Sequence, residues 1–143
     1  MKVRIAALLL VLAIYGVSLL LPAMYGGETL LTGMPILVFG WILVPSGQCF
    51  AWLANPLFAL ALLLFLLRRY QVSGGVAILA ALVGLDTFRV RRFPPNEAYE
   101  VAVDAIGSAF YVWEASFLVL AAIAFWLASV HRSSPAAPVR SPD

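Results

Sequence analysis

Hydrophobic residues occur in this chain as long uninterrupted runs, and most charged residues lie in the short segments between them. No charged residue interrupts the run Cys49–Leu67. A helix of about 20 apolar residues, at roughly 1.5 Å per residue, crosses the ~30 Å hydrocarbon layer of a bilayer. The pattern therefore predicts an all-α integral membrane protein with four transmembrane helices, at about residues 5–21, 49–67, 72–88 and 106–130.

The composition supports this interpretation. Hydrophobic residues make up 64% of the 143 residues and charged residues 11%, whereas a soluble domain is about 45–50% apolar and about 25% charged. A chain this short cannot bury so much apolar surface in a water-soluble core. We therefore expect lipid to surround most of a single domain, residues 1–132. The tail, residues 133–143, is rich in Pro, Ser and Ala, and we expect it to be disordered.

Two positive charges, Lys2 and Arg4, precede the first apolar run. Secretory signal peptides begin in the same way, but their apolar region is usually 7–15 residues long and ends at an A-x-A site. The run Ile5–Leu21 is longer, and no clear site of that kind follows it. We therefore expect an uncleaved first helix whose N-terminus is cytoplasmic, because positive charges favour that side.

The short apolar segment 35–44 has too few residues to span a membrane alone, and such runs are typical of interfacial or re-entrant segments. An alternative joins residues 29–44 into a full span and gives five spans. With four spans, six Lys and Arg residues are cytoplasmic and three are not, whereas with five the split is five against four. The positive-inside rule favours four spans with both termini in the cytoplasm.

Charged residues are densest in the segment 86–104, which contains three arginines and four acids and is expected to face the periplasm. These arginines depart from the positive-inside rule, so we expect acidic neighbours to pair with them. Two residues of the segment have the i, i+3 spacing of a local helical ion pair. The candidate periplasmic ion pairs involve Asp86, Arg89, Arg91 and Arg92. Farther along, Asn96 is expected to cap a helical turn that continues to Val103.

Polar side chains also occur at the start of the second predicted span. Gln48, Trp52 and Asn55 have the i, i+4, i+7 spacing of one helical face, which we expect to point toward other helices. Pro56 removes the N–H that would bond the Trp52 carbonyl, and this favours a kink. Asn55 then bonds freed backbone groups or a neighbouring helix, or it contacts a ligand or an ion.

Glu114 is the ionisable residue that lies well inside a predicted span. An acidic residue at a helix centre costs roughly 2.5–3.5 kcal/mol on insertion scales. We therefore expect it to pair with an arginine of the 89–92 stretch or with Gln48 or Asn55, or to stay protonated at a helix interface. A proton or cation site and a carboxylate that reaches headgroup water are the alternatives. The adjacent Trp113 is expected at the outer interface, where amphipathic rings are favoured.

Known catalytic patterns are scarce in this sequence. There is one histidine, His131, and one cysteine, Cys49, and there is no phosphate-binding loop, H-E-x-x-H or G-x-S-x-G pattern. We therefore expect no enzymatic activity, metal or cofactor, and the absence of a basic cluster among aromatics argues against nucleic acid. The expected function is an accessory or structural subunit that binds the lipid bilayer and other membrane subunits or copies of itself. The alternative is a small transporter or channel component whose path is lined by Glu114 and Asn55.

Several short motifs resemble those of small multi-span bacterial inner-membrane proteins of uncharacterised function. The motifs are Gly40-Trp41, Ala51-Trp52-Leu53-Ala54-Asn55-Pro56, and Gly107 with Tyr111-Val112-Trp113. The resemblance implies a location in the bacterial inner membrane and a structural or functional use for Trp52 and Asn55. It implies no particular activity.

Overall fold

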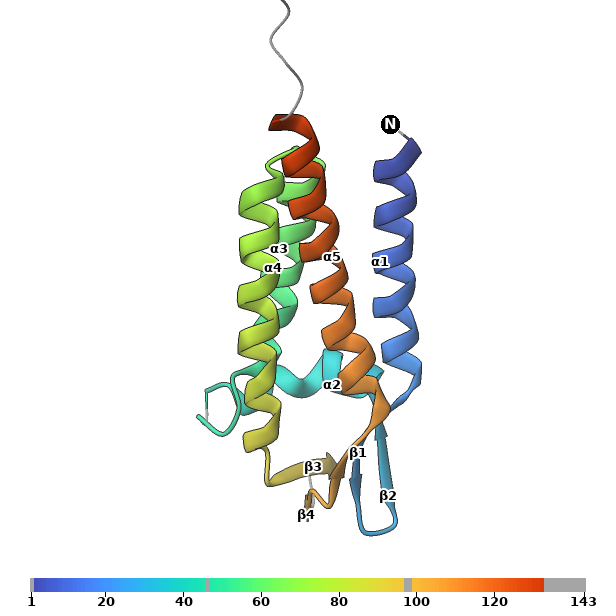
Figure 1. Cartoon of the computed structure of the whole chain (residues 1–143). Helices are drawn as coiled ribbons and strands as arrows, with labels where there is room; N and C mark the ends of the chain where they lie inside the picture. Colours follow the sequence, from blue (N-terminus) through green and yellow to red (C-terminus); the bar gives the residue numbers. More distant parts are fainter. Residues whose placement is uncertain (1, 46, 97–98, 133–143) are drawn as a thin grey trace, which may run out of the picture.

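Four helices lie side by side as a bundle in the computed structural model, which describes residues 2–45, 47–96 and 99–132 (Figure 1). They are α1 (Lys2–Leu20), α3 (Ala54–Leu66), α4 (Tyr70–Gly84) and α5 (Ser108–Arg132). Helix α4 packs against both α3 and α5, and α1 packs against α5. The N-terminus of α1, the α3–α4 turn and the end of α5 lie at one end of the bundle.

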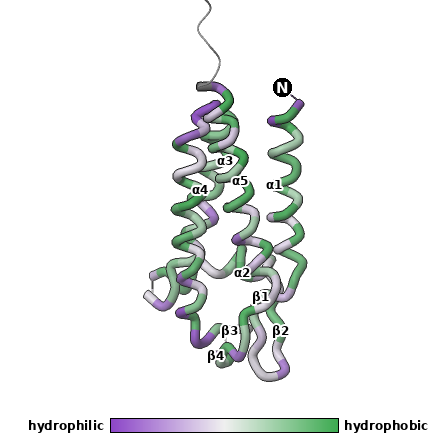
Figure 2. Tube along the Cα trace, viewed as in Figure 1, coloured by the Kyte–Doolittle hydropathy of each residue, from purple (hydrophilic) through white to green (hydrophobic). Residues whose placement is uncertain are grey.

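In the part of the chain that the structure describes, three helices are long and apolar enough to cross a membrane. They are Lys2–Leu20, Tyr70–Arg89 and Ser108–His131, the second being α4 continued by the 3₁₀-helix η3 (Leu85–Arg89). The prediction of a helical chain with several potential membrane spans is thereby confirmed. The fourth helix, which consists of η2 (Ala51–Leu53) and α3, is apolar but shorter. The hydropathy along the chain matches this arrangement, with apolar helices and hydrophilic ends (Figure 2).

Small residues bring the helices together. The buried side of α4 carries only Tyr70 and small residues, namely Ser73, Gly74, Ala77, Ala80, Ala81 and Gly84. A Cβ atom at Gly74 would lie 2.8 Å from the Phe125 ring of α5, so a larger residue there would force this ring to shift. Phenylalanine rings from the neighbouring helices, including Phe65 and Phe117, fill the core and have no exposed surface. The bundle core is therefore tightly packed around α4.

Short strands at the opposite end of the bundle make the prediction of a purely helical fold wrong there. β1 (Pro22–Gly26) lies between β2 (Thr29–Thr32) and β5 (Ala105–Ile106), while β3 (Arg92–Asn96) pairs with β4 (Tyr99–Ala102). All of these pairings are antiparallel.

The first hairpin has a two-residue loop, and its first residue, Gly27, has the positive φ of 56° that such loops favour. The predicted helical turn from Asn96 to Val103 is also wrong, because β4 occupies that segment. Val101 of β4 pairs with Phe93, whose side chain is 2% exposed in a second small core. Burial of this ring against its neighbours favours the strand over the turn.

The short apolar segment 35–44 forms α2 (Gly33–Phe39) and the 3₁₀-helix η1 (Gly40–Leu43). They lie across the end of the bundle, between the four helices and the strands (Figure 1). The alternative of a full span over residues 29–44 does not form, because Thr29–Thr32 is strand β2. A separate short segment, interfacial or re-entrant, was predicted for residues 35–44, and the structure shows a separate segment there. The disorder predicted for residues 133–143 lies outside the described residues.

At Pro56, where a kink was predicted, the helix type changes just before the proline, between η2 and α3. Pro56 lies in the first turn of α3, where its missing N–H removes no intrahelical bond. The preceding turn, Ala51–Leu53, is a 3₁₀-helix, and the N–H of Ala54 bonds the carbonyls of Ala51 and Trp52. The chain therefore changes from 3₁₀ to α geometry here.

Candidate functional site

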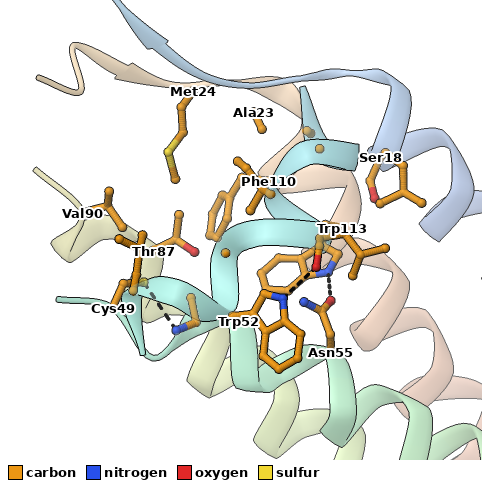
Figure 3. Close-up of a pocket in the computed structure, with 18 of the residues that line it drawn as sticks. Ser18, Ala23, Met24, Cys49, Trp52, Asn55, Thr87, Val90, Phe110 and Trp113 are labelled. Atoms are coloured by element: carbon orange, nitrogen blue, oxygen red, sulfur yellow. Dashed lines mark hydrogen bonds between the residues drawn. The ribbon is translucent and has the colours of Figure 1, made fainter. Parts of the chain in front are cut away.

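Asn55 is the centre of a hydrogen-bond cluster that joins three helices. Its Oδ1 accepts one bond from the Tyr15 hydroxyl of α1 at 2.9 Å and another from Trp113 Nε1 of α5 at 3.0 Å. Because an indole nitrogen only donates, the Trp113 bond fixes the orientation of the amide. Figure 3 shows the Trp113–Asn55 bond at the edge of a cavity. The predicted bond from Asn55 to a neighbouring helix is confirmed.

Trp52 holds the short helix α2 against the start of α3. Its Nε1 donates to the Leu37 carbonyl at 2.8 Å, and its Cδ1 lies where a Cβ on Gly40 would approach to 3.0 Å (Figure 3). The Trp52 ring therefore packs against Gly40, which has no side chain to clash with it. These contacts position α2 and η1 across the end of the bundle.

Gln48 does not share a helical face with Trp52 and Asn55. Helical geometry begins at Ala51, so Gln48 lies in a bend before the helix and is exposed. The prediction that it forms an intramembrane polar contact is wrong for this reason. It lines a surface depression with the arginines of the charged segment.

A cavity of about 90 Å³ lies between the C-terminal part of α1, the N-terminal part of α5, the start of α3 and the crossing segment α2–η1. This volume equals that of about three water molecules in the liquid. The side chains labelled around it in Figure 3 are mostly apolar, and the polar ones include Ser18, Asn55 and Thr87. Because the Asn55 oxygen already accepts two bonds, its amide N–H groups are the donors that this residue still offers to a guest. The cavity suits a small apolar group with a hydrogen-bond acceptor.

Glu114 is buried in the contact between α4 and α5, with 8% of its surface exposed. Its Oε1 has no hydrogen-bond partner in the described part of the chain, and it lies against the backbone of Gly84. Asn55 was one of the partners expected for Glu114, but its side-chain oxygen bonds Trp113 and Tyr15 instead. A carboxylic acid in this position is far cheaper to bury in its protonated form.

The predicted ion pair between Asp86 and Arg89 is confirmed, with Oδ1 and Nη1 3.0 Å apart. Because the Arg89 side chain is 62% exposed, this pair contributes little to stability. Asp86 has a second role that the sequence did not indicate, since its Oδ2 accepts the Phe50 N–H at 2.6 Å. The carboxylate thereby ties the start of η3 to the residue just before η2. Among the described residues, Arg91 and Arg92 form no ion pair, and both are exposed.

Two further residues matter that were not singled out as site residues. Tyr15 bonds Asn55 and also stacks on Phe58 with ring centroids 5.1 Å apart. At the opposite end, Arg4 Nη2 donates to the Leu66 carbonyl at 2.8 Å, and its guanidinium lies 6.0 Å from the centroid of the Tyr70 ring. A cation at a helix C-terminus is stabilising. The sequence offered one indication of the Tyr15 contact, because Tyr15 lies within an otherwise apolar run.

No family model matches the chain, and neither a curated protein nor a solved structure matches it. Within residues 2–45, 47–96 and 99–132, no three His, Cys, Asp or Glu residues are grouped so that they could hold a metal ion.

Proposed function

We propose that this chain is a non-catalytic accessory subunit of a bacterial membrane assembly, and that its β1–β2 hairpin contacts a partner subunit. The observation that carries the proposal is an exposed apolar pair on this hairpin. Tyr25 and Leu30 lie opposite each other in the strand register, and they are 41% and 51% exposed. The neighbouring pair, Met24 and Leu31, faces the second core instead.

The position of the hairpin argues against lipid as the partner of Tyr25 and Leu30. It extends beyond the ends of the helices, on the far side of the crossing helix α2 (Figure 1). Lipid chains cover the helices, so exposed apolar side chains beyond them suit a protein surface. β2 is also an edge of the three-stranded sheet, and its outer N–H and C=O groups are available to an added strand. The occupant that fits both features is an extended segment of another membrane protein.

The interior of the bundle favours a structural role. Val11, Phe65 and Phe117 have no exposed surface, and the polar group of Asn55 is used in holding α1, α3 and α5 together. A tightly packed bundle whose helices are joined through Asn55 is suited to holding its end structure in a fixed place.

The same arrangement supports a bacterial inner-membrane location with both termini in the cytoplasm and α3 as the fourth crossing. Arg4 contacts the end of α3 and the start of α4, so the basic residues there gather at one end. They are Lys2, Arg4, Arg68 and Arg69, whereas the sheet-bearing end holds Arg89, Arg91 and Arg92. The richer end is assigned to the cytoplasm.

Site-specific photo-crosslinking in intact cells tests the partner contact. A photoreactive residue at Leu30 is expected to give a discrete adduct with a different membrane protein, and the same residue at exposed Gln71, on the opposite end, is expected to give none. The substitution Leu30→Lys should then abolish co-purification of that protein without lowering the amount of folded chain. The assignment fails if position 30 gives no adduct, and an adduct only with a second copy would replace the partner subunit by a homo-oligomer.

A small transporter or channel component is the second candidate, and one observation favours it. The Glu114 carboxyl is buried with an unpartnered oxygen, as an intramembrane proton or cation site would be. In proteoliposomes, a proton or cation flux should then be lost in the double variant Glu114→Gln, Asn55→Ala. A flux equal to that of the unaltered chain would remove this candidate.

A further inference from the structure

A depression of about 290 Å³ lies on the surface at the sheet-bearing end of the bundle. It is formed where η3, the start of β3, strand β4 and the bend before η2 come together. The residues that line it are Gly47, Gln48, Arg89, Arg91, Arg92 and Glu100. Segments far apart in the sequence therefore place three guanidinium groups, one amide and one carboxylate around a single space.

Two of the three arginines in this depression are available to an anion. Arg89 is held by Asp86, but Arg91 and Arg92 have no acidic partner among the described residues. The backbone at this point is fixed, because the Val103 N–H donates to the Arg91 carbonyl at 2.9 Å. Guanidinium groups bind phosphate oxygens through paired, charge-assisted hydrogen bonds. The depression thus has the chemistry of a phosphate site.

The depression lies at the border between apolar and polar surface. Phe88 directly precedes Arg89 and is 49% exposed, and Phe50 lies two residues after Gln48 and is 41% exposed. Strongly hydrophilic positions begin at this end of the helices (Figure 2). Lipid phosphates occupy this depth in a bilayer, between the hydrocarbon core and water.

We propose that this depression binds the headgroup of a phosphoethanolamine lipid. Arg91 and Arg92 hold the phosphate, and the Glu100 carboxylate receives the ammonium group. Glu100 decides the headgroup class, because a carboxylate in the same space repels a purely anionic headgroup and attracts a positively charged amine. The positive-inside rule predicts few basic residues at this end, and the proposal gives a reason for the arginines that are there. It does not depend on the partner contact of the β1–β2 hairpin.

Native mass spectrometry of the purified full-length chain, released from nanodiscs with equal amounts of phosphatidylethanolamine and phosphatidylglycerol, tests the site. The unaltered chain is expected to retain phosphatidylethanolamine in preference. The variant Arg91→Gln, Arg92→Gln should lower its apparent affinity by at least about tenfold, because two charge-assisted contacts are lost. The variant Glu100→Gln should keep lipid but lose the preference for the amine headgroup.

The matched control is Arg68→Gln, Arg69→Gln, which removes the same charge from exposed positions at the opposite end. It should leave retention unchanged, and the far-ultraviolet circular dichroism of every variant should match that of the unaltered chain. Equal losses in both double variants would mean that charge alone attracts lipid, and this would overturn the proposal. Unchanged retention in the Arg91, Arg92 variant would overturn it as well.

Soluble probes separate a lipid headgroup from a free phosphate compound. O-phosphoethanolamine and inorganic phosphate, each added at millimolar concentration, should displace little of the bound lipid, because they lack acyl chains that contact the apolar surface beside Phe50 and Phe88. Complete displacement by either probe would assign the site to a soluble phosphate and overturn the lipid assignment.

Discussion

At the scale of single residues, individual glycines decide how closely helices α4 and α5 approach. Gly84 lies against the Glu114 carboxyl, and a Cβ there would also come within 3.0 Å of the Trp113 ring. Gly75 is on the same helix but has no atom of another segment within 4 Å of the position of its Cβ. Two glycines that look alike in the sequence therefore have opposite roles.

Gly84→Ala should lower the free energy of unfolding by about 1–3 kcal/mol, the usual cost of overpacking. Gly75→Ala is the matched control and should leave stability unchanged or raise it by up to about 1 kcal/mol, because alanine favours the helix. Unfolding in mixed micelles with increasing dodecyl sulfate, followed by tryptophan fluorescence, measures both. The double variant Gly84→Ala, Glu114→Ala should recover part of the loss, and equal effects of the two glycine variants would show that Gly84 makes no specific contact.

At the scale of elements, hydrogen bonds between distant segments hold the strands at the bundle end. The Gly27 N–H at the tip of the first hairpin donates to Asp104 Oδ2 at 2.6 Å, and the Asp104 N–H donates to the Tyr25 carbonyl at 2.8 Å. The residue just before β5 thereby fixes a hairpin that lies some eighty residues earlier. This tie keeps the β1–β2 hairpin in a single position relative to the bundle.

Asp104→Ala should loosen the hairpin while the helices stay folded, because it removes the acceptor for the Gly27 amide. Amide hydrogen exchange over residues 24–30 should become faster by about fivefold or more, the effect of losing roughly 1 kcal/mol of local stability. Glu28→Ala is the control, since it removes an equal charge from the β1–β2 loop but leaves the bond between Gly27 and Asp104 in place. Hydrogen-exchange mass spectrometry in detergent measures both variants. Equal acceleration in the two would attribute the effect to charge and not to the Asp104 bond.

At the scale of the whole molecule, the elements alternate between the two ends of the bundle. The chain descends in α1, returns in α3, descends in α4 and returns in α5, while α2 crosses one end (Figure 1). The α3–α4 turn and the β1–β2 loop therefore lie at opposite ends. If α3 crosses the membrane despite its length, these two turns face opposite sides.

Single cysteines at Gln71 and at Glu28 test this threading. Both positions are exposed, and the native Cys49 is 6% exposed and should react little. A membrane-impermeant maleimide should label Glu28→Cys in intact cells whose outer membrane is permeabilised, and Gln71→Cys only after the inner membrane is opened. The unaltered chain reports the background from Cys49. Labelling of both positions from the same side would contradict four crossings, and reversed labelling would contradict the assigned orientation.

The sequence by itself determined that the chain is built from apolar helices and where three long ones lie. This is possible because the free energy of transferring a helix into lipid depends mainly on the composition of its own residues, which a run such as Ile5–Leu21 displays directly. The ion pair between Asp86 and Arg89 was predictable for a similar reason, since its partners are three residues apart.

Only the tertiary structure decided which side chains meet. From the sequence, Asn55 could bond any neighbouring helix. In the structure, α1 and α5 are oriented so that Tyr15 and Trp113 both donate to its side-chain oxygen. The strands depend in the same way on distant pairing, as where Met24 lies opposite Ile106. A strand of a few residues has no stability of its own and forms only where another part of the chain supplies its hydrogen bonds, so no local pattern of the sequence could reveal it.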